Sequence, residues 1–295
     1  MASITRRDAG KLLLAGCAGA LMPAGKLRGA TMINSVIRGV QIGAQSYSFR
    51  DRPLDACIEA FREVGLGECE LTEGHVIPQG LKGDDRRKWE KETPDSFFKD
   101  IRKKFDDAGI QLFAYNYSFR AQYTDDEIES GFRMARALGV KYMTASSNVS
   151  VAPRVDKYAQ KYKIMVGFHG HDATSKPDEF STPETFARAM KGASPYIGVN
   201  LDIGHFVAAG GDPVAYIREH HSKIVCLHLK DRKKDHGDNL PFGEGETPIV
   251  AVLHLLRDNH WKIPANIEYE YGKPGMDTVA EVKKCFEYCK KALES

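Results

Sequence analysis

The sequence has little of several features that define whole classes of proteins. Its 295 residues include only six cysteines and two tryptophans. Six cysteines in a chain of this length do not make a disulfide scaffold. An apolar run near the N-terminus, residues 12–22, is too short to cross a bilayer, and no other stretch is apolar enough. We therefore expect no integral membrane span.

A strong excess of either charge is also missing. The formal net charge is +2, but residues 1–30 hold five Lys or Arg and one acidic residue, so the rest of the chain stands at −2. Nucleic-acid binding needs a basic surface, and we expect no nucleic acid partner. With 42% hydrophobic and 28% charged residues, the composition is that of an ordinary globular protein and excludes a disordered, collagen-like or coiled-coil chain.

Residues 1–30 have the pattern of an export signal. Arg6 and Arg7 precede the apolar run and small residues follow it, which resembles a twin-arginine signal. That route exports proteins already folded, often with a cofactor or metal in place, so we expect an exported, periplasmic protein. Two alternatives stay open. Residues 14–17 match a lipoprotein box, which would anchor the protein through an acylated Cys17, and cytosolic chains can also begin with basic residues.

Eight short β-rich runs alternate with longer segments of helical period. We predict strands over residues 39–45, 68–72, 110–115, 140–145, 163–168, 197–203, 223–229 and 265–269. We predict helices over residues 53–64, 94–108, 125–138, 151–161, 183–190, 213–220, 249–259 and 278–293. Strands separated by helices form parallel βαβ units. The α/β pattern therefore predicts a single (β/α)8 TIM barrel over residues 37–295, preceded by the export signal, with a doubly wound sheet as second choice.

Polar residues gather where the predicted strands end. Two insertions, residues 74–92 and 231–247, also follow strand ends, which is where barrel active sites are built. The histidines, carboxylates and lysine at the ends of strands 2 and 5 to 8 include Glu70, His169, His171, Asp202, His205, His228, Lys230, Glu268 and Glu270. Each alone could be an ordinary loop or capping residue. Together they predict a site for one divalent metal ion, Mn²⁺, Co²⁺, Zn²⁺ or Fe²⁺.

Four short pieces resemble the xylose-isomerase-like TIM-barrel superfamily of sugar isomerases, epimerases, inosose dehydratases and AP-endonuclease-type enzymes. They are residues 45–50 (QSYSFR), 201–206 (LDIGHF), 228–232 (HLKDR) and 267–270 (IEYE), and the likeness runs from about Val40 to Leu293. In that family an acid, an Asp, a His and a Glu on strands 5 to 8 hold one divalent metal. Carried over by position, the resemblance implies the ligands His169, Asp202, His228 and Glu268.

His169 departs from the epimerase pattern, which has a Glu at this position. In the epimerases the glutamates of strands 5 and 8 bind metal and also move protons on opposite faces of the substrate. An imidazole that binds metal through one nitrogen cannot act as a base through the same nitrogen. Beside Glu268, a different base is then needed, and His171, His205 and Glu70 are the candidates.

On strand 8, Glu268 and Glu270 point to the same face because they are two residues apart. We favour Glu268 as the ligand since it ends the apolar run, and Glu270 then becomes a salt-bridged residue of the rim. Lys230 could hold a substrate oxygen or stabilise an oxyanion, or it could pair with Asp231. Other candidates for substrate binding are the aromatic and basic residues Tyr47, Phe49, Trp89, Tyr115 and Arg232.

The resemblance implies an enzyme that acts on a sugar or keto-sugar through an enediolate, since a divalent ion acidifies the carbon between two chelated oxygens. Return of the proton gives an isomerase or epimerase, and loss of a β-substituent gives a lyase, either an eliminase or a dehydratase; hydrolysis of keto-glycosides is a further alternative. A non-catalytic sugar-binding barrel also stays open. Phosphodiester cleavage is disfavoured because it needs more histidines and a basic face. A homo-oligomer is compatible with the sequence.

Overall fold

The computed structural model describes residues 31–273 and 275–295. The predicted export signal, with Arg6, Arg7 and Cys17, lies outside the described residues. Among the helices that the structure describes, none combines the length and the apolar character needed to cross a membrane.

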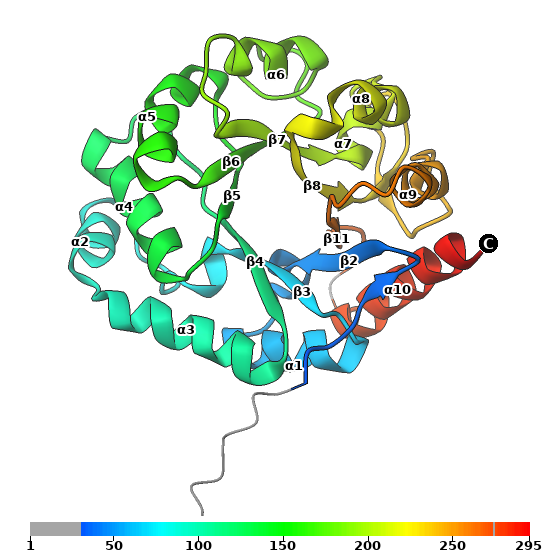
Figure 1. Cartoon of the computed structure of the whole chain (residues 1–295), viewed down its shortest axis with the longest axis horizontal. Coiled ribbons are helices and arrows are strands. Elements are labelled where there is room, and N and C mark those ends of the chain that lie inside the picture. Colours follow the sequence, from blue (N-terminus) through cyan, green and yellow to red (C-terminus); the bar gives the residue numbers. More distant parts are fainter. Residues whose placement is uncertain (1–30, 274) are drawn as a thin grey trace, which may run out of the picture.

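Parallel strands close into a barrel (Figure 1). In the order of the chain, the eight strands of its wall are β2 (Val40–Gln45), β3 (Glu68–Thr72), β4 (Gln111–Asn116), β5 (Tyr142–Ala145), β6 (Met165–His169), β7 (Ile197–Asp202), β8 (Ile224–Leu229) and β11 (Ala265–Ile267). β2 pairs in parallel with both β3 and β11, which completes the ring. The predicted (β/α)8 barrel is therefore confirmed, and the doubly wound alternative is wrong. A short strand, β1 (Val36–Ile37), adds to β2 in antiparallel direction.

An outer ring of helices covers the barrel (Figure 1). They are α1 (Leu54–Val64), α3 (Asp95–Ala108), α4 (Asp125–Ala137), α5 (Ala152–Tyr162), α6 (Pro183–Met190), α8 (Pro213–His220), α9 (Ile249–Asp258) and α10 (Thr278–Glu294). Short 3-10 turns are η1 (Ser46–Phe49), η2 (Glu73–His75), η3 (Val149–Val151) and η4 (His221–Lys223). Amphipathic faces explain this arrangement, because each helix turns its apolar side to the strands.

Two helices differ from the prediction. α2 (Gly83–Glu92) lies in the predicted insertion after β3, and α7 (Ile203–Ala208) begins where the predicted sixth strand, residues 197–203, should continue. That strand ends at Asp202 because the Asp202 carboxylate accepts a hydrogen bond from the His205 backbone N–H and caps α7. β6 begins later than predicted because Lys163 takes a left-handed conformation, φ 54°, as the C-cap of α5.

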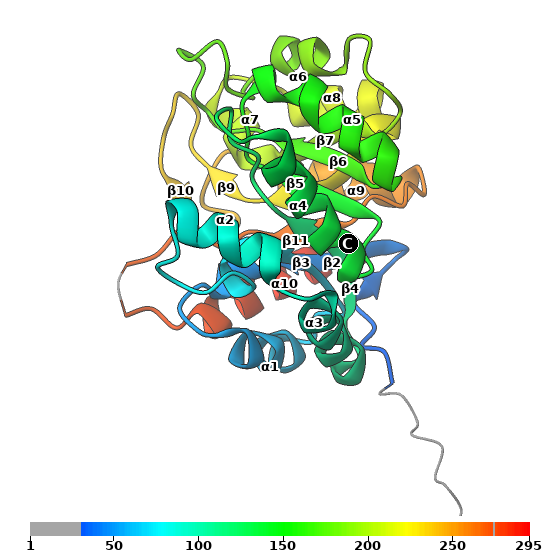
Figure 2. The same ribbon diagram turned by 90° about the vertical axis from the view of Figure 1, so that its left-hand side faces the viewer.

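The long insertions lie at the end of the barrel where the strands finish. After β8, the strands β9 (Asp231–Arg232) and β10 (Asn239–Leu240) form an antiparallel hairpin. Seen from the side, α2, α7 and this hairpin lie toward the left, whereas β1 lies toward the right (Figure 2). This is the end at which TIM barrels build their active sites.

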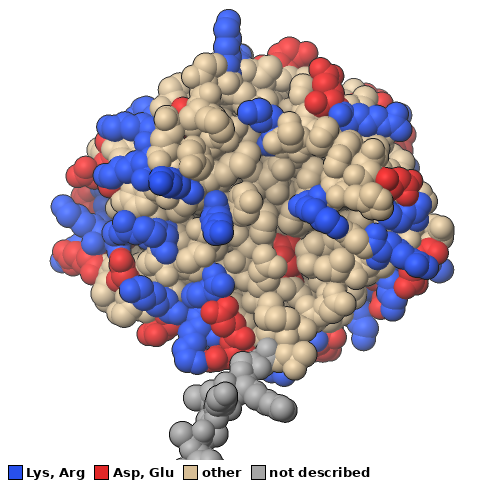
Figure 3. All heavy atoms as spheres, viewed as in Figure 1, with Lys and Arg blue, Asp and Glu red and all other residues tan. Residues whose placement is uncertain are grey.

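The barrel interior is polar as well as apolar. Glu68, Glu70, Thr144, Asn200 and Asn266 are all buried within the described strands. Burial, with the neighbouring Glu70 carboxylate adding to it, raises the pKa of Glu68 well above its ordinary value. On the outside, Lys and Arg side chains are interspersed with Asp and Glu around the periphery of the face in Figure 3. The centre of that face is largely uncharged.

Candidate metal centre

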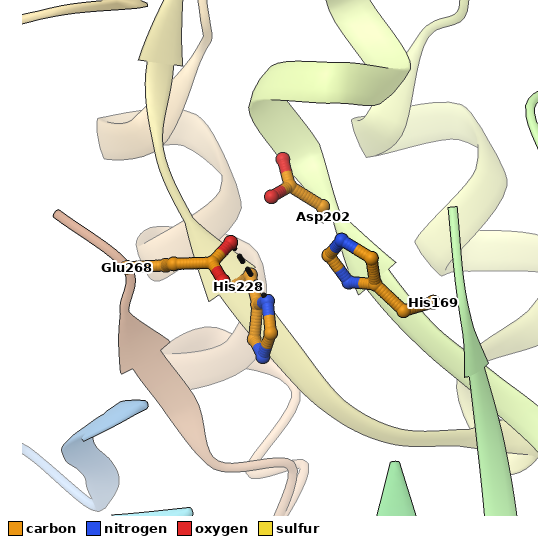
Figure 4. Close-up of side chains that lie close together, drawn as sticks. All are labelled: His169, Asp202, His228 and Glu268. Carbon is orange, nitrogen blue, oxygen red and sulfur yellow. Dashed lines mark hydrogen bonds and ion pairs between the residues drawn. The ribbon is translucent and has the colours of Figure 1, made fainter. Parts of the chain in front are cut away.

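Four side chains from neighbouring strands converge in the barrel. His169 ends β6, Asp202 ends β7, His228 belongs to β8 and Glu268 follows β11. One donor atom from each residue lies within 4.8 Å of those of the other three, and all four residues are buried. Figure 4 shows their side chains pointing toward one another. Parallel pairing of adjacent strands produces this convergence. His169 of β6 pairs with Asn200 of β7, and Asp202 of β7 pairs with His228 of β8.

The environment of His169 leaves one nitrogen available to a metal. Its Nδ1 lies 2.6 Å from Oδ1 of Asn200, so Nδ1–H donates to the amide oxygen and Nε2 keeps its lone pair. The Asn200 amide in turn donates to Cys226 Sγ at 2.9 Å, which fixes its orientation. Burial holds the pKa of His169 well below its ordinary value. The neutral imidazole is the form that binds metals.

His228 lies between two carboxylates. Its Nε2 is 2.8 Å from Oε2 of Glu70, and its Nδ1 is 3.1 Å from Oε2 of Glu268. When Nε2–H donates to Glu70, Nδ1 is the nitrogen that faces the other donors. Burial alone would lower the pKa of His228, but the two carboxylates outweigh it and hold the pKa well above its ordinary value. A metal that binds at Nδ1 therefore has to displace a proton.

The structure does not support Glu70 as a base. Its side chain is completely buried, and it accepts hydrogen bonds from Thr144 Oγ1 at 2.5 Å and Asn266 Nδ2 at 3.1 Å in addition to His228. Such a carboxylate has no route to a substrate. Glu70 is instead a positioning residue that orients the imidazole of His228.

Lys230 brings a positive charge into the cluster. Its Nζ forms ion pairs with Asp202 Oδ2 at 3.0 Å, Glu268 Oε2 at 2.8 Å and Glu270 Oε2 at 2.6 Å. Although burial raises the pKa of Asp202, the charge of Lys230 together with His205 and His169 outweighs this, and the pKa lies below its ordinary value. Pairing of Lys230 with Asp231 is not observed, because the Asp231 carboxylate accepts backbone N–H groups of residues 243, 245 and 247. Glu270 is partly exposed at the rim, where the sequence placed it.

The two other histidines lie beside the donors. The His171 ring centroid is 4.8 Å from that of His169 and 5.3 Å from that of His205. Burial, with a smaller contribution from His205, lowers the pKa of His171 to about 4. Among the described residues, no side-chain hydrogen bond to the His171 ring is found. His205 is more restrained, since Arg232 Nη1 lies 2.6 Å from its Nδ1 and Lys230 Nζ lies 3.1 Å from its Nε2.

Arg232 is held in place by its own loop. Its guanidinium donates to the Gly237 carbonyl oxygen at 2.7 Å and to Asp172 Oδ2 at 3.1 Å. The His205 side chain, with a smaller contribution from Arg232, holds the pKa of Asp172 far below its ordinary value. Arg232 therefore lies near the cluster, and its positive charge is already paired with Asp172.

The predicted aromatic residues do not gather at the cluster. Tyr115 lies between Ala114 and Asn116 in β4, and Asn116 points into the barrel to reach Thr144 Oγ1 at 3.0 Å, so Tyr115 faces the opposite way. Trp89 packs edge-on against Phe97 and Phe98.

Phe49 and Tyr47 differ in their exposure to solvent. Phe49 is fully buried against Phe61, with ring centroids 5.2 Å apart. Tyr47 is 38% exposed and lines a cavity after β2 and β3, with the Arg50 guanidinium 4.6 Å from its ring centroid. The expected stacking roles of Tyr115, Trp89 and Phe49 are therefore not supported, whereas Tyr47 is accessible.

Sequence reasoning missed the uncharged groups that orient the donors. Asn200, Asn266 and Thr144 hold His169 and Glu70 in place. Each is a polar residue inside a run of apolar strand residues, and that interruption of the pattern is the signal that would have identified them.

Residues 58–291 match the family described as the xylose isomerase-like TIM barrel. The chain belongs to this family. Its curated relatives include rhizopine catabolism protein MocC of Rhizobium meliloti, 23% identical over 63% of this chain and 59% of the relative. They also include an inosose dehydratase of Clostridium tetani (24% identical; 37% of this chain, 41% of the relative) and the L-ribulose-5-phosphate 3-epimerase UlaE of Escherichia coli (29%; 33% and 34%). The chain thus spans less than two thirds of the length of each.

Solved structures share the fold. A sugar phosphate isomerase/epimerase from Parabacteroides distasonis superposes with a TM-score of 0.62 at 21% identity, over 85% of this chain and 95% of that one. The IolI protein, solved with a zinc atom, gives 0.62 at 16% identity over 86% and 96%. The relatives of this chain are therefore enzymes of the isomerase, epimerase and dehydratase type, on a barrel that in one case holds zinc.

Proposed function

We propose that this protein is a divalent-metal-dependent enzyme that removes a proton from a carbon next to a carbonyl group of a sugar or keto-sugar. The observation that carries the proposal is the buried group of His169, Asp202, His228 and Glu268, whose donor atoms lie within 4.8 Å of one another. Two imidazoles and two carboxylates suit Zn²⁺, Mn²⁺, Co²⁺ or Fe²⁺. The epimerase and dehydratase names of the relatives support this class of reaction.

The residues present fit such an ion. Asn200 orients His169 and Glu70 orients His228, so that one nitrogen of each ring faces the carboxylates. A bound divalent ion would polarise adjacent substrate oxygens and lower the pKa of the carbon between them. The protein must then supply the base and the charge that balances the developing anion.

His171 is the residue best placed to take the proton. It lies beside His169, and its ring is not committed to another side chain within the described residues. Its low pKa leaves the imidazole neutral and able to accept a proton at neutral pH. Lys230 is a cation at the same place and can stabilise the negative charge that develops on the substrate, an enediolate.

Proton removal can lead to two classes of reaction. Return of the proton gives an isomerase or epimerase, the reaction class that the family resemblance favours. Elimination of a β-substituent gives a lyase, and one observation favours it: His169 replaces the glutamate that would serve as the second base in a two-face proton transfer.

Incubation of the metal-loaded protein with free ketoses and keto-glycosides in D₂O, followed by NMR, tests the proposal. An isomerase places deuterium on the neighbouring carbon, an epimerase places it on the original carbon with inverted configuration, and a lyase releases the β-substituent. Asp202→Ala serves as the control without metal. Binding of these sugars with neither deuterium incorporation nor product would contradict the proposal and favour the non-catalytic sugar-binding barrel.

We also propose export to the periplasm by the twin-arginine route. Arg6 and Arg7 support this location, since they precede a short apolar run in residues 1–30. Arg6→Lys combined with Arg7→Lys should keep the protein in the cytoplasm, as measured by cell fractionation. Unchanged export of this variant would contradict the route, and loss of membrane association in Cys17→Ala would favour the lipid anchor.

A further inference from the structure

We propose that Lys230 is a built-in competitor of the metal ion: its ammonium group binds the same carboxylates as the divalent ion, and metal binding requires it to shift toward Glu270. The inference rests on the metal site of the proposed function, but not on the reaction or the substrate. It assigns Lys230 a role in setting metal affinity, in addition to any contact with substrate.

The contacts of the ammonium group carry the inference. Lys230 Nζ lies 3.0 Å from Asp202 Oδ2 and 2.8 Å from Glu268 Oε2, and both carboxylates belong to the four-residue donor group. Glu270 Oε2 at 2.6 Å and His205 Nε2 at 3.1 Å are also within reach. Of these four contacts, only those to Glu270 Oε2 and His205 Nε2 have hydrogen-bond geometry, and Asp202 Oδ2 has no hydrogen-bond partner among the described residues. The ammonium can therefore keep both hydrogen bonds while its ion pairs with Asp202 and Glu268 are released.

The backbone prevents Lys230 from leaving the site altogether. Gly204 in α7 packs so closely that a Cβ at this position would overlap the Lys230 backbone carbonyl and Cβ. The Lys230 side chain is only 2% exposed. The base of the side chain is therefore fixed, and only the end of the chain can move.

Glu270 offers the ammonium a place outside the donor group. It is not one of the four donors, its side chain is 26% exposed, and its carboxylate makes the shortest contact to Lys230 Nζ. Tilting toward Glu270 keeps one ion pair while it frees Asp202 and Glu268 for another cation. Lys230 keeps its proton in this exchange: the ammonium moves and the divalent ion enters, and the proton that is displaced comes from His228.

Coulomb's law gives the sign of the expected effect. Two cations that share buried carboxylates repel each other, and this repulsion is stronger in a protein interior than in water. A neutral residue at position 230 should therefore tighten metal binding. Without metal, the same change leaves Asp202 without the ammonium and Glu268 with only His228 as a cationic partner, which should lower the melting temperature.

The test is calorimetric titration of chelator-stripped protein with Zn²⁺. Lys230→Met and Lys230→Gln should both bind Zn²⁺ at least about tenfold more tightly than the wild type. Lys230→Gln keeps a polar side chain and serves if the methionine variant does not fold. Lys234→Met is the matched control, because it removes the same charge from an exposed position in the same loop and should leave affinity unchanged.

Thermal unfolding provides a second readout. Relative to the wild type, the Lys230 variants should melt at lower temperature in chelator, and the difference should shrink in saturating Zn²⁺. Equal or weaker Zn²⁺ affinity in the variants would overturn the inference and make Lys230 a residue that only positions the carboxylates. A wild type that binds no metal would instead overturn the metal site on which the proposed function rests.

Discussion

The two halves of the barrel differ in what their strands carry toward the interior. β6, β7, β8 and β11, here called the donor half, supply His169, Asp202, His228 and Glu268. β2 to β5, the supporting half, supply Gln45, Thr72, Asn116 and Thr144, which are buried and uncharged, and the carboxylate of Glu70, which bonds to His228 across the barrel. The proposed metal donors thus come from one half, and the other half orients one of them, His228, through Glu70.

The largest effect should follow removal of a donor. His228→Ala or Asp202→Asn should weaken Zn²⁺ binding by roughly a hundredfold or more, because a site of four ligands loses one, or loses one of its negative charges. Isothermal titration measures the affinity. Thr72→Val, a buried change in the supporting half whose hydroxyl accepts, among the described residues, only from the Gly74 backbone, is the matched control and should bind as the wild type does. Equal losses in all three variants would remove the distinction between the halves.

The hydrogen bond from His228 to Glu70 connects the supporting half to the donor half, and its removal should weaken metal binding. Glu70→Gln should lower metal affinity roughly ten- to a hundredfold, the scale of changes in groups that orient metal ligands. The amide can turn its NH₂ to His228 Nε2 and favour the wrong tautomer. Glu68→Gln alters the same strand without a hydrogen bond to His228, and its affinity should stay at the wild-type value. An unaffected Glu70→Gln would mean that His228 needs no such partner.

His169→Glu tests why the donor half carries an imidazole on β6. Metal binding should persist, because both groups are acceptable ligands, while turnover should fall roughly ten- to a hundredfold. The neutral imidazole leaves the site one unit more positive than a glutamate would, which favours formation of a carbanion. Metal content and turnover are measured together. An equally active variant would put the ordinary isomerase ahead of the lyase.

The smallest effect concerns the stability of the supporting half. The pKa of Glu68 is raised far above its ordinary 4.5 in the folded state, chiefly by burial. Folding therefore requires proton uptake at any pH between the unfolded and folded pKa values, and stability falls as pH rises through this window. Glu68→Gln should raise the melting temperature by a few degrees at pH 8 and by less at pH 5. A gain that does not depend on pH would show that Glu68 is charged in the fold.

The sequence predicted the barrel because short β-rich runs and longer segments of helical period alternate eight times along the chain. It missed α2, since residues 83–92 have almost no apolar positions from which to read a period. It also extended the sixth predicted strand into α7, since the apolar residues continue past Asp202 while the capping hydrogen bond is not visible in the sequence.

For the site, topology was sufficient to bring the strand ends together, and the family resemblance then selected the four residues whose donor atoms converge. The direction in which individual side chains point could not be predicted from the sequence. The register between β3 and β4 shifts between Cys69 and Glu70, so alternation counted from the start of β4 does not give the face of Tyr115, which only the contact of its neighbour Asn116 with Thr144 reveals. Glu70 was expected to be a candidate base because its buried contacts could not be foreseen. They involve His228, Thr144 and Asn266, which come from strands far apart in the sequence.

The most direct test of the central claim is Co²⁺ titration of the chelator-stripped wild-type protein, followed by visible absorption. The claim predicts saturation at one Co²⁺ per chain, with ligand-field bands typical of nitrogen and oxygen donors that disappear in the His228→Ala variant. Absence of Co²⁺ binding by the wild type, or the same bands at the same stoichiometry in His228→Ala, would contradict it.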